Sequence, residues 1–158
     1  MATIRFAEEA DTPTILQFIR ALAAYEKLLD ACVADEASLR EGLFGGRSYA
    51  EVLLIEERNV AHGFALFYHS FSTFLAKPGL YLEDLFVDPD QRGKGYGKAL
   101  LKHLAEIAVE RGCGRLEWSV LDWNKPSIDF YLSVGAKPMD EWTVYRLDGS
   151  ALSALAAS

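Results

Sequence analysis

The hydrophobic positions of the chain repeat with two spacings, one typical of helices and one typical of strands. Apolar residues three and four positions apart predict amphipathic helices, the first of which begins at Asp11-Thr12-Pro13. The predicted helices cover residues 12–25, 34–42, 97–111, 125–134 and a loose terminal stretch from residue 151. Short apolar runs predict strands at residues 3–7, 49–56, 60–68, 81–87, 115–120 and 143–147.

The order of these elements bounds the fold. A tight turn at residues 57–59 joins two strands into an antiparallel hairpin, and the later strand, helix and strand form a parallel pair with a right-handed crossover. The sequence therefore predicts an α/β fold with a mixed sheet. The aromatic residues Phe71 and Phe74 lie in a predicted loop, at 71–78, where a packing cluster or a subunit contact is expected rather than a binding platform. With 158 residues, 51% of them hydrophobic, one domain over residues 1–158 is expected.

Charge and composition exclude several classes of function. The chain has 23 acidic and 16 basic residues, a balance that disfavours nucleic acid as a partner and favours small cationic molecules. No apolar run is long enough to cross a membrane, and the N-terminus lacks the apolar core of a signal peptide, so a cytoplasmic protein is expected. Cys32, Cys113 and the three histidines show no ligand spacing, which predicts reduced thiols and no metal.

The most informative stretch is residues 81–101, which passes from a strand through a glycine-rich turn into a helix. The strand carries Glu83 and Asp84, and alternation predicts one acid on each face of the sheet. In the turn, three glycines allow backbone N–H groups at a helix start to approach a ligand, and three cations add positive charge. These residues are Arg92, Gly93, Lys94, Gly95, Gly97 and Lys98. A phosphate group is the expected ligand.

Two common phosphate motifs do not fit this turn. A Walker A loop requires Ser or Thr where the chain has Ala99, and a glycine where it has Arg92. The dinucleotide fingerprint requires a third glycine where the chain has Lys98 or Leu100. The remaining pattern, Arg-x-x-Gly-x-Gly after a strand, resembles the pyrophosphate-binding motif of the Gcn5-related N-acetyltransferases (GNAT), which bind acetyl-coenzyme A. A flexible connection that binds nothing is the alternative.

Further motifs extend this resemblance over nearly the whole chain. It is most similar to the diamine (spermidine/spermine-type) N-acetyltransferases. The motifs that carry the similarity, in order, are Ala24-Tyr-Glu26, Tyr81-Leu-Glu-Asp-x-Phe-Val87, Arg92-Gly-x-Gly-x-Gly97, Trp123-Asn-x-Pro-Ser127, and Phe130-Tyr131 followed by Gly135-Ala136. The resemblance implies the GNAT fold, a central mixed sheet with helices on both faces.

The resemblance also implies a set of site residues. The pantetheine arm of coenzyme A would pair with the backbone of Leu85, Phe86 and Val87. The pyrophosphate would lie on Arg92, Gly93, Lys94, Gly95, Tyr96, Gly97 and Lys98. Further contacts to coenzyme A would come from Asn124, Lys125, Pro126, Ser127 and Tyr131, although Lys125 stands where relatives often have an acid. The amine would be bound by Tyr25, Glu26, Glu83, Asp84, Glu117, Trp118 and Ser119.

Acetyl transfer to an amine needs a base for the ammonium proton and an acid for the departing thiolate. Glu83 and Tyr131 fit these roles, and a backbone N–H near Leu85 or Phe86 could polarise the thioester carbonyl. Each residue also has a structural alternative: Glu83 could be a sheet carboxylate paired with Lys or Arg, and Tyr131 a core aromatic.

Three functions remain open on this basis. The first is acetylation of a diamine or polyamine. The second is acetylation of an amino-acid side chain, such as lysine or thialysine, or of a protein amine. The third is a non-catalytic sensor that binds acyl-CoA without turnover. Because relatives with this pattern are usually dimers, a homodimer with cleft residues near the subunit contact is also expected.

Overall fold

A computed structural model describes residues 1–158, the whole chain. It comprises two compact units, Met1–Leu121 and Asp122–Ser158. The first unit contains the sheet and three α-helices, and the second unit contains two further α-helices. The single domain expected from the length of the chain stays a prediction.

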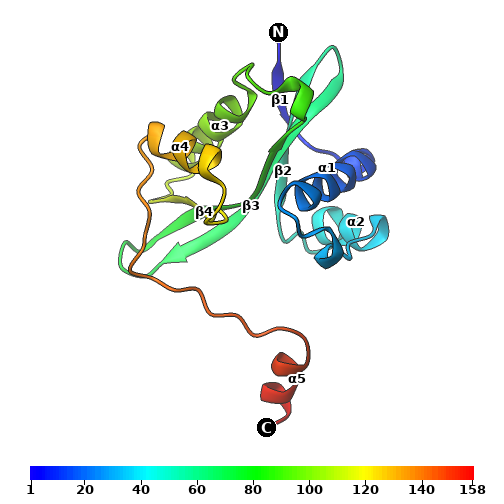
Figure 1. Ribbon diagram of the computed structural model, residues 1–158. Helices are drawn as coiled ribbons and strands as arrows, with labels where there is room; N and C mark the ends of the chain where they lie inside the picture. Colours follow the sequence, from blue (N-terminus) through cyan, green and yellow to red (C-terminus); the bar gives the residue numbers. More distant parts are fainter. The chain divides into compact units, whose positions relative to one another are not determined.

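The first unit is built on one five-stranded sheet with the strand order β1-β2-β3-β4-β5 (Figure 1). Its strands are β1 (Thr3–Phe6), β2 (Glu51–Glu57), β3 (Val60–Ser72), β4 (Lys77–Val87) and β5 (Leu116–Trp118). The first four strands pair antiparallel in sequence order, whereas β5 pairs with β4 in parallel after the helical crossover. This arrangement confirms the predicted mixed sheet, hairpin and parallel pair.

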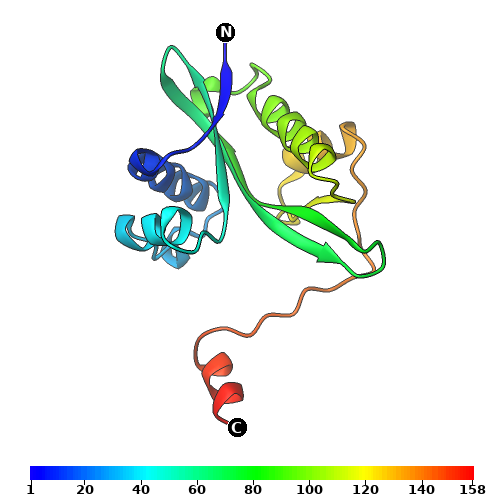
Figure 2. The same ribbon diagram turned by 180° about the vertical axis from the view of Figure 1, so that it is seen from behind.

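Three helices cover the sheet of this unit. They are α1 (Thr12–Tyr25), α2 (Glu36–Phe44) and α3 (Tyr96–Glu110), with short 3₁₀ turns at Glu9–Asp11, Leu29–Ala31 and Pro89–Gln91. Helices α1 and α2 lie on one side of the sheet and α3 lies on the other (Figure 2). Pro13 stands in the first turn of α1 as predicted, and the Asp35 side chain caps α2 by accepting from the Ser38 N–H. The capping side chain predicted at Asp11 is wrong, because that carboxylate makes no cap hydrogen bond and accepts from the Arg5 guanidinium instead.

Alternation along the strands decides which side chains meet α1. Phe64 and Leu66 of β3 and Phe86 of β4 belong to the same buried cluster as Phe18 of α1. The rings of Phe18 and Phe64 stack with their centroids 5.6 Å apart. Burying each such side chain contributes about 1.5–3 kcal/mol, so this cluster fixes which face of the sheet α1 covers. This face is called the α1 face below.

The hairpin between β3 and β4 is longer than the sequence predicted. Residues 71–78 were expected to form a loop, but Phe71 pairs with Pro78 and Ser72 with Lys77, so only residues 73–76 turn. The prediction was wrong because the two segments lie directly opposite each other and extend the ladder, which composition alone does not reveal. Phe71 and Phe74 are both exposed.

The second unit contains α4 (Lys125–Ser133) and α5 (Gly149–Ala157). The predicted cap of α4 is confirmed, since the Asn124 side chain accepts from the Ser127 N–H at 3.4 Å and Pro126 stands in the first turn. The strand predicted at 143–147 does not form. These residues have an alternating pattern, but all of them are exposed and none pairs with another strand, and a strand requires a ladder partner.

Candidate active site

A β-bulge lies at the acidic pair of β4. Leu66 of β3 stands opposite Asp84, but the next residue, Phe67, stands opposite Leu82. Glu83 is therefore an extra residue without a partner in β3. A bulge of this kind bends the strand and re-aims the side chains beside it.

The bulge places both acids on the α1 face. Asp84 stands opposite Leu66, which belongs to the core cluster under α1. Tyr81 stands opposite Tyr68, which lies two residues beyond Leu66 and so faces the same way, and Glu83 is two residues beyond Tyr81. The prediction of one acid on each face was wrong, because simple alternation fails where an extra residue enters the strand.

Three carboxyl groups share this region. Burial, reinforced by the negative charges of Glu83 and Glu26, raises the pKa of Asp84 to about 6. Burial also raises the pKa of Glu26, which follows the last residue of α1. Glu83 is exposed and forms no salt bridge with Lys or Arg, so the structural alternative considered for it is not supported. A cationic ligand would relieve the repulsion among these carboxyl groups.

Arg92 connects the end of α1 to the end of β4. Its guanidinium lies 5.0 Å from the ring centroid of Tyr25 and 5.6 Å from that of Phe86, and its Nε donates to the Val87 carbonyl at 3.1 Å. Arg92 therefore fixes Tyr25 of α1 beside the start of the glycine loop, defined as residues 92–98. Two predicted parts of the site, the amine end and the phosphate end, meet at this residue.

The glycine loop has the geometry of a phosphate site. Gly93 and Gly95 have φ values of +83° and +81°, which favour glycine, and a Cβ at either position would meet no atom within 4 Å. Gly95 precedes α3, so the first N–H groups of that helix have no helical acceptors and are available to an anion. Because Gly93 and Gly95 carry no side chains, open space remains through which a pyrophosphate can approach the backbone N–H groups. The loop therefore fits a pyrophosphate.

The side chains of the glycine loop are not equally available to a ligand. Lys94 Nζ donates to Gln91 Oε1 at 2.6 Å and lies 3.9 Å from the Glu57 carboxylate. Tyr96 is buried and its hydroxyl donates to Glu57 at 2.9 Å, so only the backbone of Tyr96 is placed to meet a ligand. Lys98 lies in the first turn of α3.

The second half of β4 has an open edge. β5 pairs only with Leu80, Tyr81 and Leu82, so beyond the bulge β4 has a strand partner in β3 alone. Leu85, Phe86 and Val87 lie in this half, where the sequence predicted backbone pairing with the pantetheine arm. An extended chain with polar groups can add to such an edge.

The predicted segment at the end of β5 lies beside the first half of β4. Glu117 stands opposite Tyr81 and Trp118 opposite Leu82. The Tyr81 hydroxyl and Ser119 Oγ are 2.7 Å apart. Tyr68 was not predicted, although its position on the α1 face opposite Tyr81 places it near Glu83; the long-range register that reveals this is not visible in the sequence.

The remaining predicted residues belong to the second unit. Asn124, Lys125, Pro126 and Ser127 form the start of α4, and the Lys125 ammonium is paired with Asp129 at 3.1 Å. Tyr131 lies one turn beyond Ser127 in the same helix, with its ring 5.5 Å from that of Phe130. Their parts in the site stay predictions.

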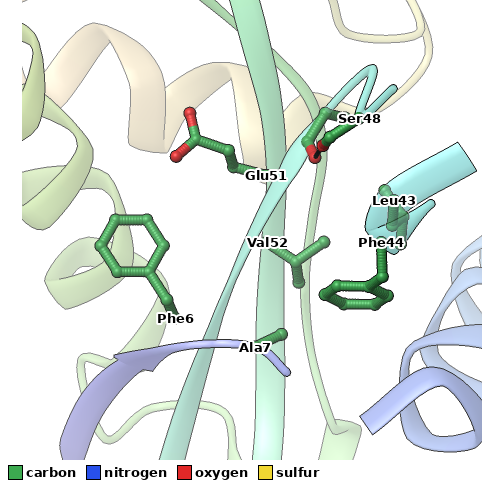
Figure 3. Close-up of a pocket in the computed structure, with 8 residues that line it drawn as sticks. Phe6, Ala7, Leu43, Phe44, Ser48, Glu51 and Val52 are labelled. Carbon is green, nitrogen blue, oxygen red and sulfur yellow. Dashed lines mark hydrogen bonds between the residues drawn. The ribbon is translucent and has the colours of Figure 1, made fainter. Parts of the chain in front are cut away.

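A pocket elsewhere in the first unit does not have the character of an active site. It measures about 170 Å³, below the 300–1,000 Å³ or so of typical ligand pockets. Figure 3 shows Phe6 and Glu51 to one side of Val52, and Leu43 and Phe44 to the other. Its one carboxylate, Glu51, already accepts from both terminal nitrogens of Arg111 at 2.6 and 2.9 Å.

None of the helices in the structure has the length and apolar character needed to cross a membrane.

Comparison with known proteins identifies the family to which this geometry corresponds. A model of the acetyltransferase (GNAT) family matches residues 16–136. The chain is 38% identical to a thialysine N-epsilon-acetyltransferase of Bos taurus, over 97% of this chain and 96% of that protein. It is 34% identical to an L-ornithine N5-acetyltransferase of Arabidopsis thaliana, over 96% of this chain and 86% of that protein.

Two further matches agree. A spermidine/spermine N(1)-acetyltransferase-like protein of Homo sapiens is 34% identical over 92% of this chain, which corresponds to 22% of that protein. Among solved structures, an integron cassette protein from the mobile metagenome of V. cholerae has a TM-score of 0.85 and 30% identity, covering 99% of this chain and 98% of that one. The predicted fold and family are thereby confirmed.

Proposed function

The chain belongs to the acetyltransferase (GNAT) family, and we propose that it transfers the acetyl group of acetyl-CoA to a primary amine of a small cationic substrate. One observation carries this proposal: the bulge in β4 brings Glu83 and Asp84 onto the α1 face together with Glu26, while the glycine loop follows the same strand. An amine site and a pyrophosphate site thus lie along one strand.

The first unit would hold acetyl-CoA by two means. The N–H groups of the glycine loop and the start of α3 bind the pyrophosphate, and the open edge of β4 at 85–87 pairs with the pantetheine arm. Acetyl-CoA supplies an activated thioester. A backbone N–H near Leu85 or Phe86 polarises its carbonyl as negative charge develops on the oxygen.

Glu83 is the base in this mechanism. An alkylamine is almost fully protonated at neutral pH, so a carboxylate must attract the cation and accept one proton, directly or through water. The amine nitrogen then forms a bond to the carbonyl carbon and the carbon–sulfur bond breaks. Glu83 suits the role because it is exposed and unpaired by Lys or Arg.

Tyr131 is the proposed acid, which gives its phenolic proton to the departing thiolate and regains one from solvent. Its support is the family resemblance and its position in α4, about two turns after the Asn124 cap and one turn after Ser127. Tyr131→Phe should lower kcat by roughly 10²-fold while acetyl-CoA still binds, as measured by steady-state kinetics and calorimetry. Wild-type turnover of the variant would make Tyr131 a packing residue.

Two substrate classes are compatible with this site. The main candidate is a diamine or polyamine, consistent with three acidic groups near one another. The second is the terminal amine of an amino-acid side chain, which is favoured by relatives named for thialysine and ornithine. Both classes present a primary ammonium on an alkyl chain, which is what Glu26, Glu83 and Asp84 would recognise.

A substrate panel tests the proposal. Thiol release from acetyl-CoA is measured with putrescine, spermidine, thialysine, ornithine, lysine and a lysine peptide, and acetyl-CoA binding is the control. Release with a free diamine or amino acid is expected, and the ratio of kcat/KM values separates the two classes. Tight binding of acetyl-CoA with no release for any amine would instead support a sensor.

We also propose that the chain forms a homodimer. The support for this proposal is the resemblance, because relatives with this pattern are usually dimers. Sedimentation at micromolar concentration should give the mass of two chains, and a monomer would contradict this.

A further inference from the structure

A pair of tyrosines stands on the α1 face directly beside Glu83. Tyr68 of β3 and Tyr81 of β4 are register partners, and their ring centroids are 5.3 Å apart with a 33° angle between the ring planes. Glu83 is two residues beyond Tyr81 on the same face. The bulge therefore places the exposed carboxylate next to two hydroxyl-bearing rings from two strands.

The two tyrosines are held differently. The Tyr81 hydroxyl lies 2.7 Å from Ser119 Oγ, which ties its ring to the end of β5. Tyr68 makes ring contact with Tyr81, and its phenol is close to the Glu83 carboxylate. Burial first, and then the negative charge of Glu83, raises the pKa of Tyr68, with smaller effects from Tyr81 and from a hydrogen bond to Glu83. Tyr68 thus keeps its proton and can donate it as a hydrogen bond.

We propose that Tyr68 is the positioning residue of Glu83: its hydroxyl donates to the carboxylate and holds it toward the amine, while the Tyr81–Ser119 pair holds the Tyr68 ring. This inference rests on the proposed role of Glu83 as the base. An exposed carboxylate without a salt-bridge partner otherwise samples several rotamers, and a base is efficient only within hydrogen-bond reach of its proton. A phenol supplies orientation without the charge of a lysine, which would repel a cationic substrate.

Tyr68→Phe is the appropriate change, because it removes the hydroxyl and keeps the ring contact with Tyr81. We expect kcat to fall about 10-fold, the scale of one lost hydrogen bond to a charged group, with the KM for acetyl-CoA unchanged. The acid limb of the pH profile of kcat/KM should move to higher pH, because the phenol no longer stabilises the ionised carboxylate. Thialysine and spermidine serve as probe amines.

A double-mutant cycle separates positioning from packing. If Tyr68 acts through Glu83, Tyr68→Phe should have no further effect on single-turnover rates once Glu83→Gln is present. Ser119→Ala should reproduce the same change at smaller size. Tyr49→Phe is the matched control, since Tyr49 is an exposed tyrosine beside Arg47 rather than beside Glu83.

The outcomes distinguish this inference from the function on which it rests. An inactive Glu83→Gln with a Tyr68→Phe that keeps the wild-type kcat and pH profile would overturn the role of Tyr68 alone. A Tyr68→Phe defect of equal size in the Glu83→Gln background would also overturn it. Wild-type turnover of Glu83→Gln would overturn the proposed base itself.

Discussion

The two halves of β4 differ in what surrounds them. In its first half, the strand lies between β3 and β5 at residues 80–82, and Leu80 and Leu82 are almost fully buried. Beyond the bulge it pairs with β3 alone, and Glu83 is exposed while Asp84 and Leu85 are only partly buried. The strand thus has partners on both sides just before the bulge and on one side beyond it, although Phe86 of the second half packs in the core under α1. The first half therefore supplies stability, and the second leaves groups available to ligands.

The largest expected effect is a loss of kcat when Glu83, in the second half of β4, is changed. Glu83→Gln should lower kcat by about 10²–10⁴-fold, the usual contribution of a positioned base, because the amide cannot accept the ammonium proton. The free energy of unfolding should change by less than about 0.5 kcal/mol, since the side chain is exposed. Steady-state kinetics and urea denaturation measure the two effects. A rate within threefold of wild type would contradict the assignment.

A change in the first half of β4 should lower the free energy of unfolding and leave kcat nearly unchanged. Leu80→Ala should lower the free energy of unfolding by about 2–5 kcal/mol, because Leu80 is 0% exposed and its truncation leaves a cavity. The folded fraction should retain near-normal kcat. Urea denaturation checks the stability, with Val60→Ala as an exposed control. A loss of kcat in a fully folded Leu80→Ala protein would break the division between the two halves.

The glycine loop extends the comparison beyond the strand. Gly97→Val should raise the Kd for acetyl-CoA by at least about 10-fold, because the side chain occupies space needed by the pyrophosphate. The fold should persist, since the nearest atom to a Cβ at this position is Val87 Cγ2 at 4.0 Å. Calorimetry gives the Kd, and Gly46→Val is the control because a Cβ there also meets no atom within 4 Å. An unchanged Kd would move the cofactor site elsewhere.

The smallest expected effect concerns the pH dependence of stability. The folded protein holds the Asp84 proton more tightly than the unfolded chain, because its pKa is raised from 3.8 to about 6. The stabilising contribution of this group is therefore complete below about pH 4 and is lost as the pH rises through 6. Asp84→Asn should be more stable than wild type at pH 8 by about 1–3 kcal/mol, with the difference vanishing near pH 4.

Chemical denaturation at pH 4, 6 and 8 measures this difference. Asp90→Asn is the matched control, because Asp90 is exposed after the end of the same strand. A stability gain that is equal at all three pH values, or absent at pH 8, would show that Asp84 is not held in its neutral form by the site.

Local patterns in the sequence were sufficient to predict many elements of this fold. The apolar spacing of α1 and α3, the turn at residues 58–59 and the glycine loop each depend on neighbouring residues, and each was predicted correctly. The bulge at Glu83 was not, because it depends on the register between β3 and β4. The strand expected at 143–147 failed for a related reason: alternation marks a segment that can pair, but a strand forms only where a partner is present.

We expect acetyl-CoA to bind at the second half of β4 and the glycine loop, while the first half of β4 supports the fold without touching acetyl-CoA. Amide hydrogen exchange followed by NMR, with and without saturating acetyl-CoA, tests it most directly. We expect slower exchange on binding at amides 85–87 and 93–98, and unchanged exchange at amides 79–82. Binding without any slowing at 85–87 and 93–98, or slowing confined to 79–82, would contradict it.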